Sequence, residues 1–283
     1  MTLNRIMKAV AHRSVVVARY AAGAPGAASM GEWLALGAIR ARLTGGEARL
    51  QQRADGTARE FSVRVGKDAK HRVILDLSSM AELDGFEEIF VRRIYDLAKL
   101  PFRPSLVADC GANIGLFASL CRMAWPEASL CCWEPEPRNF ARLSRQPLLQ
   151  AERCELNAAA VSDRDGELSF SGSGLGGHVV EDGMPAASRV RAVDFSAWLA
   201  GKRSERALVK IDIEGYEERL VPSLAGAWPD TCALFMETHQ EEGKDRPILD
   251  ALRSEGFRWE RLGTHDLPGD RRMFNEYYAV RGA

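Results

Sequence analysis

The chain has 283 residues, enough for one large domain or two modest ones. Its 38 Lys and Arg residues and 39 Asp and Glu residues give a net charge of −1, which argues against a protein that coats nucleic acid through a strongly basic surface. Hydrophobic residues make up 46% of the chain, and no apolar run reaches the roughly 18 residues of a membrane span, so the composition predicts a globular core.

The first 45 residues predict a basic helical leader. The first acidic residue is Glu32, and four basic residues precede it: Arg5, Lys8, Arg13 and Arg19. The apolar run at 15–18 is too short for a secretory signal. A Gly- and Pro-containing linker at 21–28 separates it from a second helix, expected from Met30 to Leu43. Such a leader either packs loosely before the domain or forms an arm that lies on an anionic membrane surface or docks on a protein.

The six cysteines favour a reducing compartment. None forms a C-x-x-C pair, and most lie in apolar runs such as 129–133, which is typical of buried, reduced thiols rather than of disulfides or a metal site. We therefore expect a cytoplasmic protein, peripheral to the inner face of the membrane if the leader binds lipid.

The rest of the chain alternates strands and helices. An accessory α/β segment is predicted at 46–100, with two short strands and a helix at 86–95, and the main domain is predicted at 101–283. Alternation of this kind predicts an α/β fold with an open, mostly parallel sheet. Its expected strands are 106–110, 130–134, 154–160, 207–212, 232–237, 258–262 and 276–280, and its expected helices are 116–123, 138–143, 216–224 and 247–254.

A glycine-containing loop follows the first of these strands, where ligands bind in such sheets. Asp109 ends the strand, and Gly111 and Gly115 lie on either side of Asn113 before a helix. The dinucleotide fingerprint would require glycine at 113 and 116, and no Gly-Lys-Ser/Thr sequence follows for a P-loop. An acid in this loop would repel a pyrophosphate but can pair with an ammonium group, which favours S-adenosylmethionine over NAD.

Other charged residues stand in or after apolar strands. Glu134 lies 19 residues beyond Gly115, where a carboxylate can accept two hydrogen bonds from the ribose of either cofactor. Charges within a buried strand are costly unless they are paired or catalytic, so they indicate either a site or an internal salt bridge, Lys210 with Asp212 or with Glu237. The remaining members of this group are Glu214 and His239.

Five motifs together resemble the FkbM-type S-adenosylmethionine-dependent methyltransferases. They are 109–115 (DCGANIG), 134–137 (EPEP) with Asn139, 157–161 (NAAAV), 210–215 (KIDIEG) and 237–239 (ETH). The resemblance covers about residues 76–242 and leaves out the first 60, and Cys110 and the glycine-rich stretch 171–178 depart from its pattern. It implies a seven-stranded, Rossmann-like class I fold and methylation of hydroxyl groups on sugars, lipids or polyketides.

The resemblance also implies roles for particular residues. The glycine loop would hold the methionine end, Glu134 the ribose, and Asn157 and Asp163 the adenine. The expected cofactor-binding set is Asp109, Gly111, Ala112, Asn113, Gly115, Glu134, Pro135, Asn139, Asn157 and Asp163.

Methyl transfer to a weakly nucleophilic hydroxyl needs an aligned acceptor and a base or a metal. Asp212 is the best-placed base, and Lys210 can neutralise the acids near it; the wider catalytic set is Asp212, Glu214, Glu237, His239, Lys210 and His178. His178 ends a glycine-rich loop that could close over the site. A divalent metal held by Asp212, Glu237 and His239 is the alternative to the base.

Two other classes stay open: an NAD-dependent oxidoreductase on the same sheet and a non-catalytic assembly module. We expect a small-molecule or glycan acceptor and no nucleic-acid partner, with a homo-oligomer as an open possibility. The sequence does not specify which hydroxyl is methylated.

Overall fold

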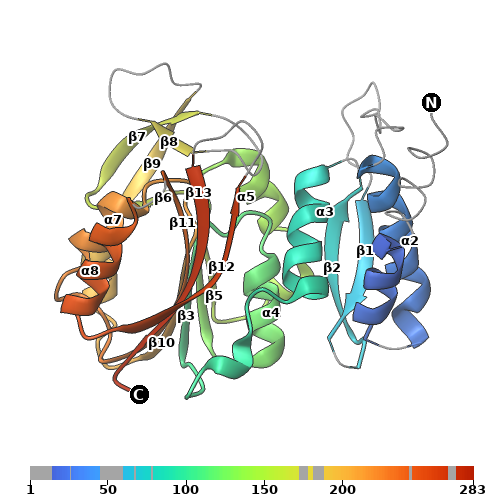
Figure 1. Cartoon of the computed structure of the whole chain (residues 1–283), viewed down its shortest axis with the longest axis horizontal. Coiled ribbons are helices and arrows are strands. Elements are labelled where there is room, and N and C mark those ends of the chain that lie inside the picture. Colours follow the sequence, from blue (N-terminus) through green and yellow to red (C-terminus); the bar gives the residue numbers. More distant parts are fainter. Residues whose placement is uncertain are drawn as a thin grey trace. The chain divides into compact units, whose positions relative to one another are not determined.

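The computed structural model describes residues 15–25, 27–44, 60–66, 68–77, 79–171, 178–180, 188–241, 244–266 and 272–283. The chain divides into two compact units (Figure 1). The small unit comprises residues 1–96 and 145–150, and the large unit comprises 97–144 and 151–283. The predicted leader and residues 46–96 of the predicted accessory segment therefore fall in the small unit, and residues 97–100 fall in the large unit. Arg5, Lys8 and Arg13 of the leader lie outside the described residues.

The small unit is a β-hairpin covered by helices. Its elements are α2 (Ala27–Thr44), β1 (Glu60–Val65), β2 (His71–Asp76) and α3 (Met80–Phe86), which continues as a π-helix over Glu87–Arg92. A further helix occupies 15–23 and ends just before residues 24 and 25, within the predicted linker. The second predicted helix and the two predicted strands are confirmed, whereas the helix expected at 86–95 begins six residues earlier and ends at Arg92.

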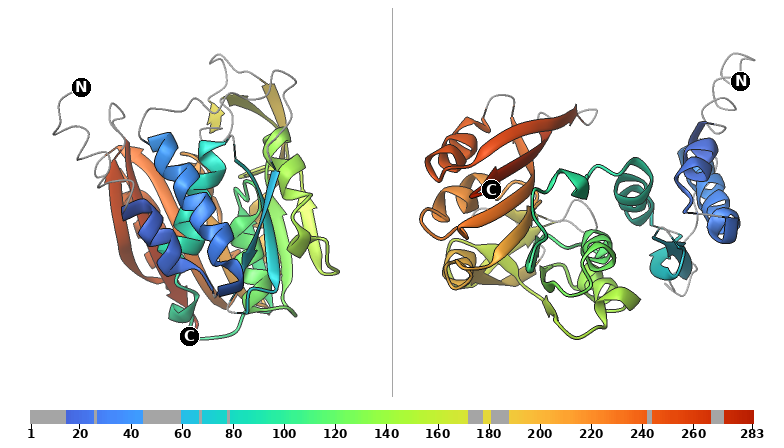
Figure 2. Two further views of the ribbon diagram at one scale, coloured as in Figure 1. Left: turned by 90° about the vertical axis from the view of Figure 1, so that its right-hand side faces the viewer. Right: turned by 90° about the horizontal axis from the view of Figure 1, so that it is seen from below.

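Helix α2 lies against the hairpin (Figure 2). Trp33 is buried, packs edge-on against Phe86 with ring centroids 5.1 Å apart, and donates from Nε1 to the Arg64 carbonyl at 2.8 Å. Glu32 accepts from the Arg64 backbone N–H at 2.7 Å and pairs with Arg72 at 3.1 Å. One turn of α2 thus provides both the apolar and the polar attachment to the hairpin.

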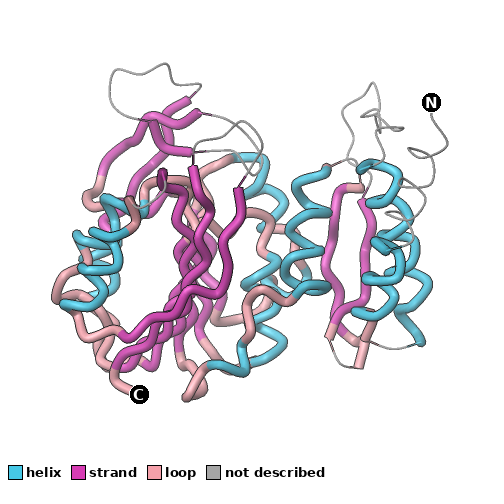
Figure 3. The backbone as a smooth tube through the Cα atoms, viewed as in Figure 1, coloured by secondary structure: helices cyan, strands magenta, loops and turns pink. Residues whose placement is uncertain are grey.

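The large unit is built on a seven-stranded sheet in the order β12-β13-β11-β10-β3-β4-β5. Figure 3 draws the strands in magenta. The five neighbouring strands from β11 to β5 run parallel, and β13 pairs antiparallel with both of its neighbours. The expected open, mostly parallel, Rossmann-like sheet is confirmed. The strands are β3 (Leu106–Cys110), β4 (Ser129–Trp133), β5 (Cys154–Asn157), β10 (Arg206–Ile211), β11 (Thr231–Glu241), β12 (Arg258–Asp266) and β13 (Arg272–Arg281).

Helices cover both faces of this sheet (Figure 1). One face carries α4 (Leu116–Ala124) and α5 (Pro137–Leu143), and the other carries α7 (Glu217–Ser223) and α8 (Arg246–Ser254). Because both faces are covered, β3 is buried at every position, as expected for a central parallel strand. In the part of the chain that is described, no helix is long and apolar enough to cross a membrane.

A second, four-stranded sheet was not expected. Its strands, in the order β6-β9-β7-β8, are β6 (Ala160–Ser162), β7 (Gly166–Ser171), β8 (His178–Val180) and β9 (Ser188–Asp194), and α6 (Phe195–Ala200) follows. The strand predicted at 154–160 is present, but its predicted end was wrong: β5 ends at Asn157, and Ala159 N–H bonds back to the Asn157 carbonyl at 2.9 Å before the chain enters the second sheet. The turn was not predicted because the Ala-Ala-Ala run at 158–160 is apolar, like the strand before it.

The order of the strands places a ligand site. The chain passes from β3 outward to β4 and β5 and then returns to β10 on the other side of β3. The crevice at the carboxyl ends of β3 and β10 is the topological switch point, where open α/β sheets bind ligands.

Candidate functional site

The glycine loop after β3 is fixed from two sides. The backbone N–H groups of Gly111 and Ala112 both donate to the Trp133 carbonyl, at 3.1 and 2.9 Å. Gly111 has φ of 78°, and a Cβ at this position would lie 1.9 Å from the carbonyl oxygen of Asp212. No other residue fits there, so the loop after β3 packs directly on the turn after β10. Asn113 and Gly115 also have positive φ, which turns the chain into α4.

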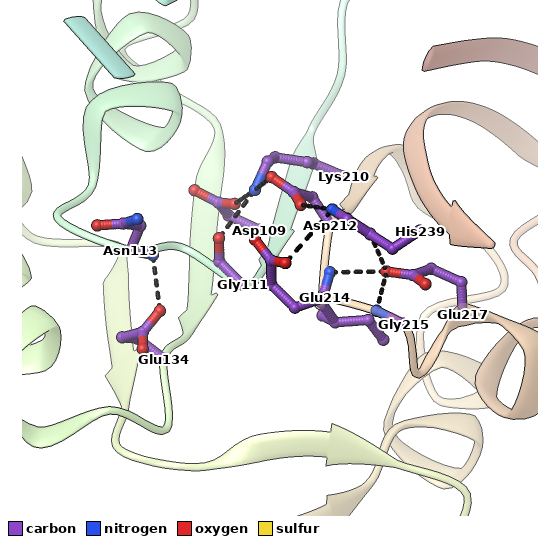
Figure 4. A network of polar contacts seen from close by, with 11 residues as sticks. Asp109, Gly111, Asn113, Glu134, Lys210, Asp212, Glu214, Gly215, Glu217 and His239 are labelled. Atoms are coloured by element: carbon purple, nitrogen blue, oxygen red, sulfur yellow. Dashed lines mark hydrogen bonds and ion pairs between the residues drawn. The ribbon is translucent and has the colours of Figure 1, made fainter. Parts of the chain in front are cut away.

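Glu134 lies at the end of β4 and is only 5% exposed. Its two carboxylate oxygens accept from the backbone N–H groups of Asn113 and Glu136, both at 2.8 Å. Figure 4 shows the first of these two bonds. Burial raises the pKa of Glu134 to about 7, against the lowering effect of these hydrogen bonds. The group thus changes charge near neutrality, and it holds the glycine loop to the next strand.

Lys210 is buried between two acids. Its Nζ donates to the Gly111 carbonyl at 2.8 Å and lies 3.4 Å from Asp109 Oδ1 and 3.3 Å from Asp212 Oδ2. Burial raises the pKa of Asp109, and Lys210 opposes the shift. The Lys210–Asp212 ion pair considered from the sequence exists, and the same ammonium also holds the glycine loop.

The turn after β10 carries Glu214 in the left-handed region, with φ of 58°. Glu217 secures this turn: one carboxylate oxygen accepts from the backbone N–H groups of Ile213 at 3.0 Å and Gly215 at 3.2 Å. The same oxygen lies 3.1 Å from Nδ1 of His239. Glu217 is fully buried, and sequence reasoning missed it; the only signal was an acid in the first turn of a helix behind a glycine turn.

His239 on β11 faces three carboxylates. Its Nδ1 contacts Glu217, and its Nε2 lies 3.7 Å from both Asp212 Oδ1 and Glu214 Oε2 (Figure 4). Burial lowers the pKa of His239, but Glu217 by charge and hydrogen bond, followed by Asp212 and Glu214, outweighs that effect and raises the pKa to about 10. Without another cation, the imidazole is therefore protonated at neutral pH.

Some of these groups border an open cleft, among them Gly111, Glu134 and Asp212. Seven members of the predicted set line it: Gly111, Asn113, Glu134, Pro135, Asn139, Asp212 and Glu214. The other lining residues are Trp133, Ala160, Val161, Phe170, Ile213 and Tyr216. The second sheet thus contributes to one wall of the cleft through β6 and β7. Ala160 and Val161 of β6 lie in the motif at 157–161, whereas no motif includes Phe170 of β7.

The remaining predicted residues lie outside this lining. Asp163 accepts from the hydroxyl of Tyr216 at 2.8 Å and from Arg219 at 3.2 Å, so it contacts the lining through Tyr216. Asn157 donates to the Cys132 carbonyl at 3.4 Å. Among the others, Lys210 bonds to Gly111 and His239 faces Asp212, both of which line the cleft. Asp109, Ala112 and Gly115 are not part of the lining.

Glu237 and His178 complete the predicted set. Glu237 is partly buried on β11, but the group whose ligand atoms lie within 4.8 Å of one another consists of Asp212, Glu214 and His239. The acid that lies close to Asp212 and His239 is thus Glu214, whereas the predicted metal site contained Glu237. His178 begins β8, and 172–177 of the predicted lid lie outside the described residues.

Comparison with known proteins adds an independent finding. No family model matches the chain. It is 38% identical over 82 residues to the methyltransferase sdnD of Sordaria araneosa, which covers 26% of this chain and 31% of that protein. It is 29% identical over 212 residues to the 31-O-demethyl-FK506 methyltransferase FkbM of Streptomyces tacrolimicus, which covers 61% of this chain and 80% of that protein. Among solved structures, the methyltransferase FkbM of Methylobacillus flagellatus KT aligns at 16% identity with a TM-score of 0.45, over 72% of this chain and 51% of that chain.

The chain therefore spans about a third of the first relative and four fifths of the second. The two sequence matches confirm the resemblance that the motifs indicate, which is to methyltransferases of the FkbM type.

Proposed function

We propose that this relative of the FkbM-type methyltransferases is an S-adenosylmethionine-dependent O-methyltransferase acting on a hydroxyl of a sugar, a glycan or a related natural product. One observation carries the proposal. The cleft that Gly111, Asn113 and Glu134 border is also bordered by Asp212 and Glu214, so a donor site and an acidic acceptor site share one space.

The charge of the cleft fits this cofactor. Glu134, Asp212 and Glu214 line it, and none of the described lining residues is Lys or Arg. S-adenosylmethionine supplies, when bound, a methyl group on a positively charged sulfonium, and it also carries an ammonium group. The pyrophosphate of NAD would meet three acids and no basic side chain, which costs free energy. The lining therefore favours the methyl donor over the dinucleotide.

Glu134 and the glycine loop are the residues that would hold the cofactor. The carboxylate of Glu134 uses one lone pair on each oxygen for a backbone N–H, and its position on the lining leaves it in reach of a ribose diol. Asn113 and Asn139 add amide groups at the same edge.

Asp212 is the group that we assign as general base for the acceptor hydroxyl. Its side chain is 25% exposed, against 2% for His239, so a substrate can reach Asp212 directly. Lys210 and His239 on either side of it fix the orientation of the carboxylate. Transfer to oxygen rather than to nitrogen or carbon is supported by the relative that acts on 31-O-demethyl-FK506.

Asp212→Asn tests this assignment. We expect the affinity for S-adenosylmethionine to stay within a few-fold of the wild type while turnover falls about 10²-fold or more, because a general base is lost and the donor site is not. Transfer of a labelled methyl group into extracts of the source cell's glycans and small molecules is the assay, and it also identifies the acceptor. Full turnover by the variant would remove Asp212 from the base role.

The two alternative functions, an NAD-dependent oxidoreductase and a non-catalytic assembly module, predict different results in the same assays. An oxidoreductase would bind NAD and transfer no methyl group. A non-catalytic module would bind S-adenosylmethionine weakly and transfer no label into any extract fraction.

A further inference from the structure

Asp212, Glu214 and His239 form a mixed nitrogen and oxygen cluster at the edge of the cleft. Their ligand atoms lie within 4.8 Å of one another. Asp212 directly follows β10, Glu214 lies in the turn after β10, and His239 lies on β11. His239 is almost fully buried, and its Nε2 points at the two carboxylates (Figure 4). The cluster therefore contains a buried imidazole nitrogen that faces two acids, and it is not a group of exposed acids alone.

The contacts of His239 Nε2 within the cluster are longer than direct hydrogen bonds. Nε2 lies 3.7 Å from each carboxylate, beyond the roughly 3.2 Å limit of a good N–H···O bond. Around an octahedral ion with bonds of roughly 2.1 Å, adjacent ligand atoms lie roughly 3.0 Å apart and opposite ones roughly 4.2 Å. The observed spacing falls between these values.

The other ring nitrogen is held as in metal-binding histidines. Such a histidine commonly donates its second N–H to a carboxylate, which fixes the ring and leaves the ligating nitrogen free of its proton. Here Nδ1 lies 3.1 Å from Glu217, a fully buried acid that is anchored by two backbone N–H groups. Glu217 therefore sets the direction in which Nε2 faces.

Negative charge accumulates around the cluster. Four carboxylates, those of Asp109, Asp212, Glu214 and Glu217, surround Lys210 and His239, and Lys210 is the permanent cation among them. Negative charge that is withdrawn from water must be compensated, either by a proton on His239 or by a metal ion in the same place.

We propose that Asp212, Glu214 and His239 bind one divalent cation of the Mn²⁺ class, with Glu217 as the positioning residue for His239. Two carboxylates and one imidazole are a donor set that suits such an ion. This site rests on the proposed function, because it lies where the acceptor would meet Asp212. With the ion bound, Asp212 would be a ligand, and the ion would orient the acceptor hydroxyl and lower its pKa; Asp212 would be the base only in the ion-free protein.

Titration of the metal-free, full-length protein with Mn²⁺ tests the site, followed by calorimetry and by the electron paramagnetic resonance signal of free Mn²⁺, with no cofactor added. We expect one ion per chain. Glu214→Gln and His239→Gln should each weaken binding at least tenfold, and Glu217→Gln should weaken it about 10- to 100-fold. Glu218→Gln is the matched control: it changes the neighbouring, exposed acid and should leave binding unchanged.

The affinity of each variant for S-adenosylmethionine distinguishes a failure of the cation site from a failure of the proposed function. Variants that still bind the cofactor but lose Mn²⁺ support the cation site. If Mn²⁺ does not bind the wild type, or binds these variants and Glu218→Gln alike, the site is refuted and the proton on His239 is what balances the charge. Loss of cofactor binding by the wild type would instead refute the proposed function.

Discussion

Glu134 is held by two backbone N–H groups and yet has a pKa of about 7, because burial outweighs those bonds. The folded protein therefore holds a proton on Glu134 that the unfolded chain, with a pKa near 4.5, has already released. Since the pKa is raised on folding, this group's contribution to stability is lost as the pH rises from about 4.5 through 7.

Comparison of the wild type with Glu134→Gln measures this effect, because glutamine keeps the shape of the neutral acid. Relative to the variant, the wild type should become less stable between pH 5 and pH 8, by about 2–3 kcal/mol. Chemical denaturation at several pH values gives the two free energies of unfolding. A difference that does not change with pH would show that Glu134 titrates normally.

The sequence predicts this residue but not its neighbour Glu217. Glu134 could be found because it ends an apolar strand at a fixed distance from a glycine loop. Glu217 lies on a helix, and only the fold shows that its carboxylate turns back beneath Ile213 and Gly215 to meet His239 from another strand. The same limit explains why Glu237 was predicted in the metal site. Glu237 lies two residues before His239 on the same strand, but Glu214, not Glu237, belongs to the group of ligand atoms around His239.

At the scale of the elements, the site depends on the contact between the loop after β3 and the turn after β10. That contact requires glycine at 111, where a Cβ would lie 1.9 Å from the Asp212 carbonyl oxygen. The expected strands and helices of the main sheet are present because buried parallel strands are apolar throughout and easily recognised. The second sheet was missed because β6 is short, with three residues, and because β7 and β9 carry exposed polar residues among their buried ones.

Gly111→Ala should displace the two loops and weaken binding of S-adenosylmethionine at least tenfold. Gly226→Ala is the matched control, because Gly226 has φ of 73°, close to the 78° of Gly111, and has no atom within 4 Å of the added Cβ. Both variants bear the same backbone strain, of about 1–2 kcal/mol, but only the first bears the clash. Equal cofactor affinities in the two variants, measured by calorimetry, would refute the role of this contact.

At the scale of the whole molecule, the chain divides into two compact units, with a boundary after residue 96. The expected leader could not be assigned from its basic residues, because charge pattern alone does not show what a helix packs against. Trp33 and Glu32 of α2 attach it to the hairpin of the small unit. The residues 145–150 also belong to that unit: Gln146 exchanges hydrogen bonds with the backbone of Ile74, both at 2.9 Å.

Two units predict two thermal transitions in differential scanning calorimetry. Trp33→Ala removes a buried ring and should lower the transition of the small unit, by the equivalent of about 3–5 kcal/mol. Added S-adenosylmethionine should raise only the transition of the large unit, because the ligand stabilises the unit that binds it. A single transition that shifts with both changes would show that the two units unfold together.

The central claim is that the cleft beside Gly111 and Glu134 binds S-adenosylmethionine. Isothermal titration of the wild type and Glu134→Ala with S-adenosylmethionine and with NAD tests it most directly. The wild type should bind S-adenosylmethionine and not NAD, and the variant should bind S-adenosylmethionine more weakly by about 1–3 kcal/mol, because hydrogen bonds to a carboxylate are lost. Binding of NAD without binding of S-adenosylmethionine would contradict the account.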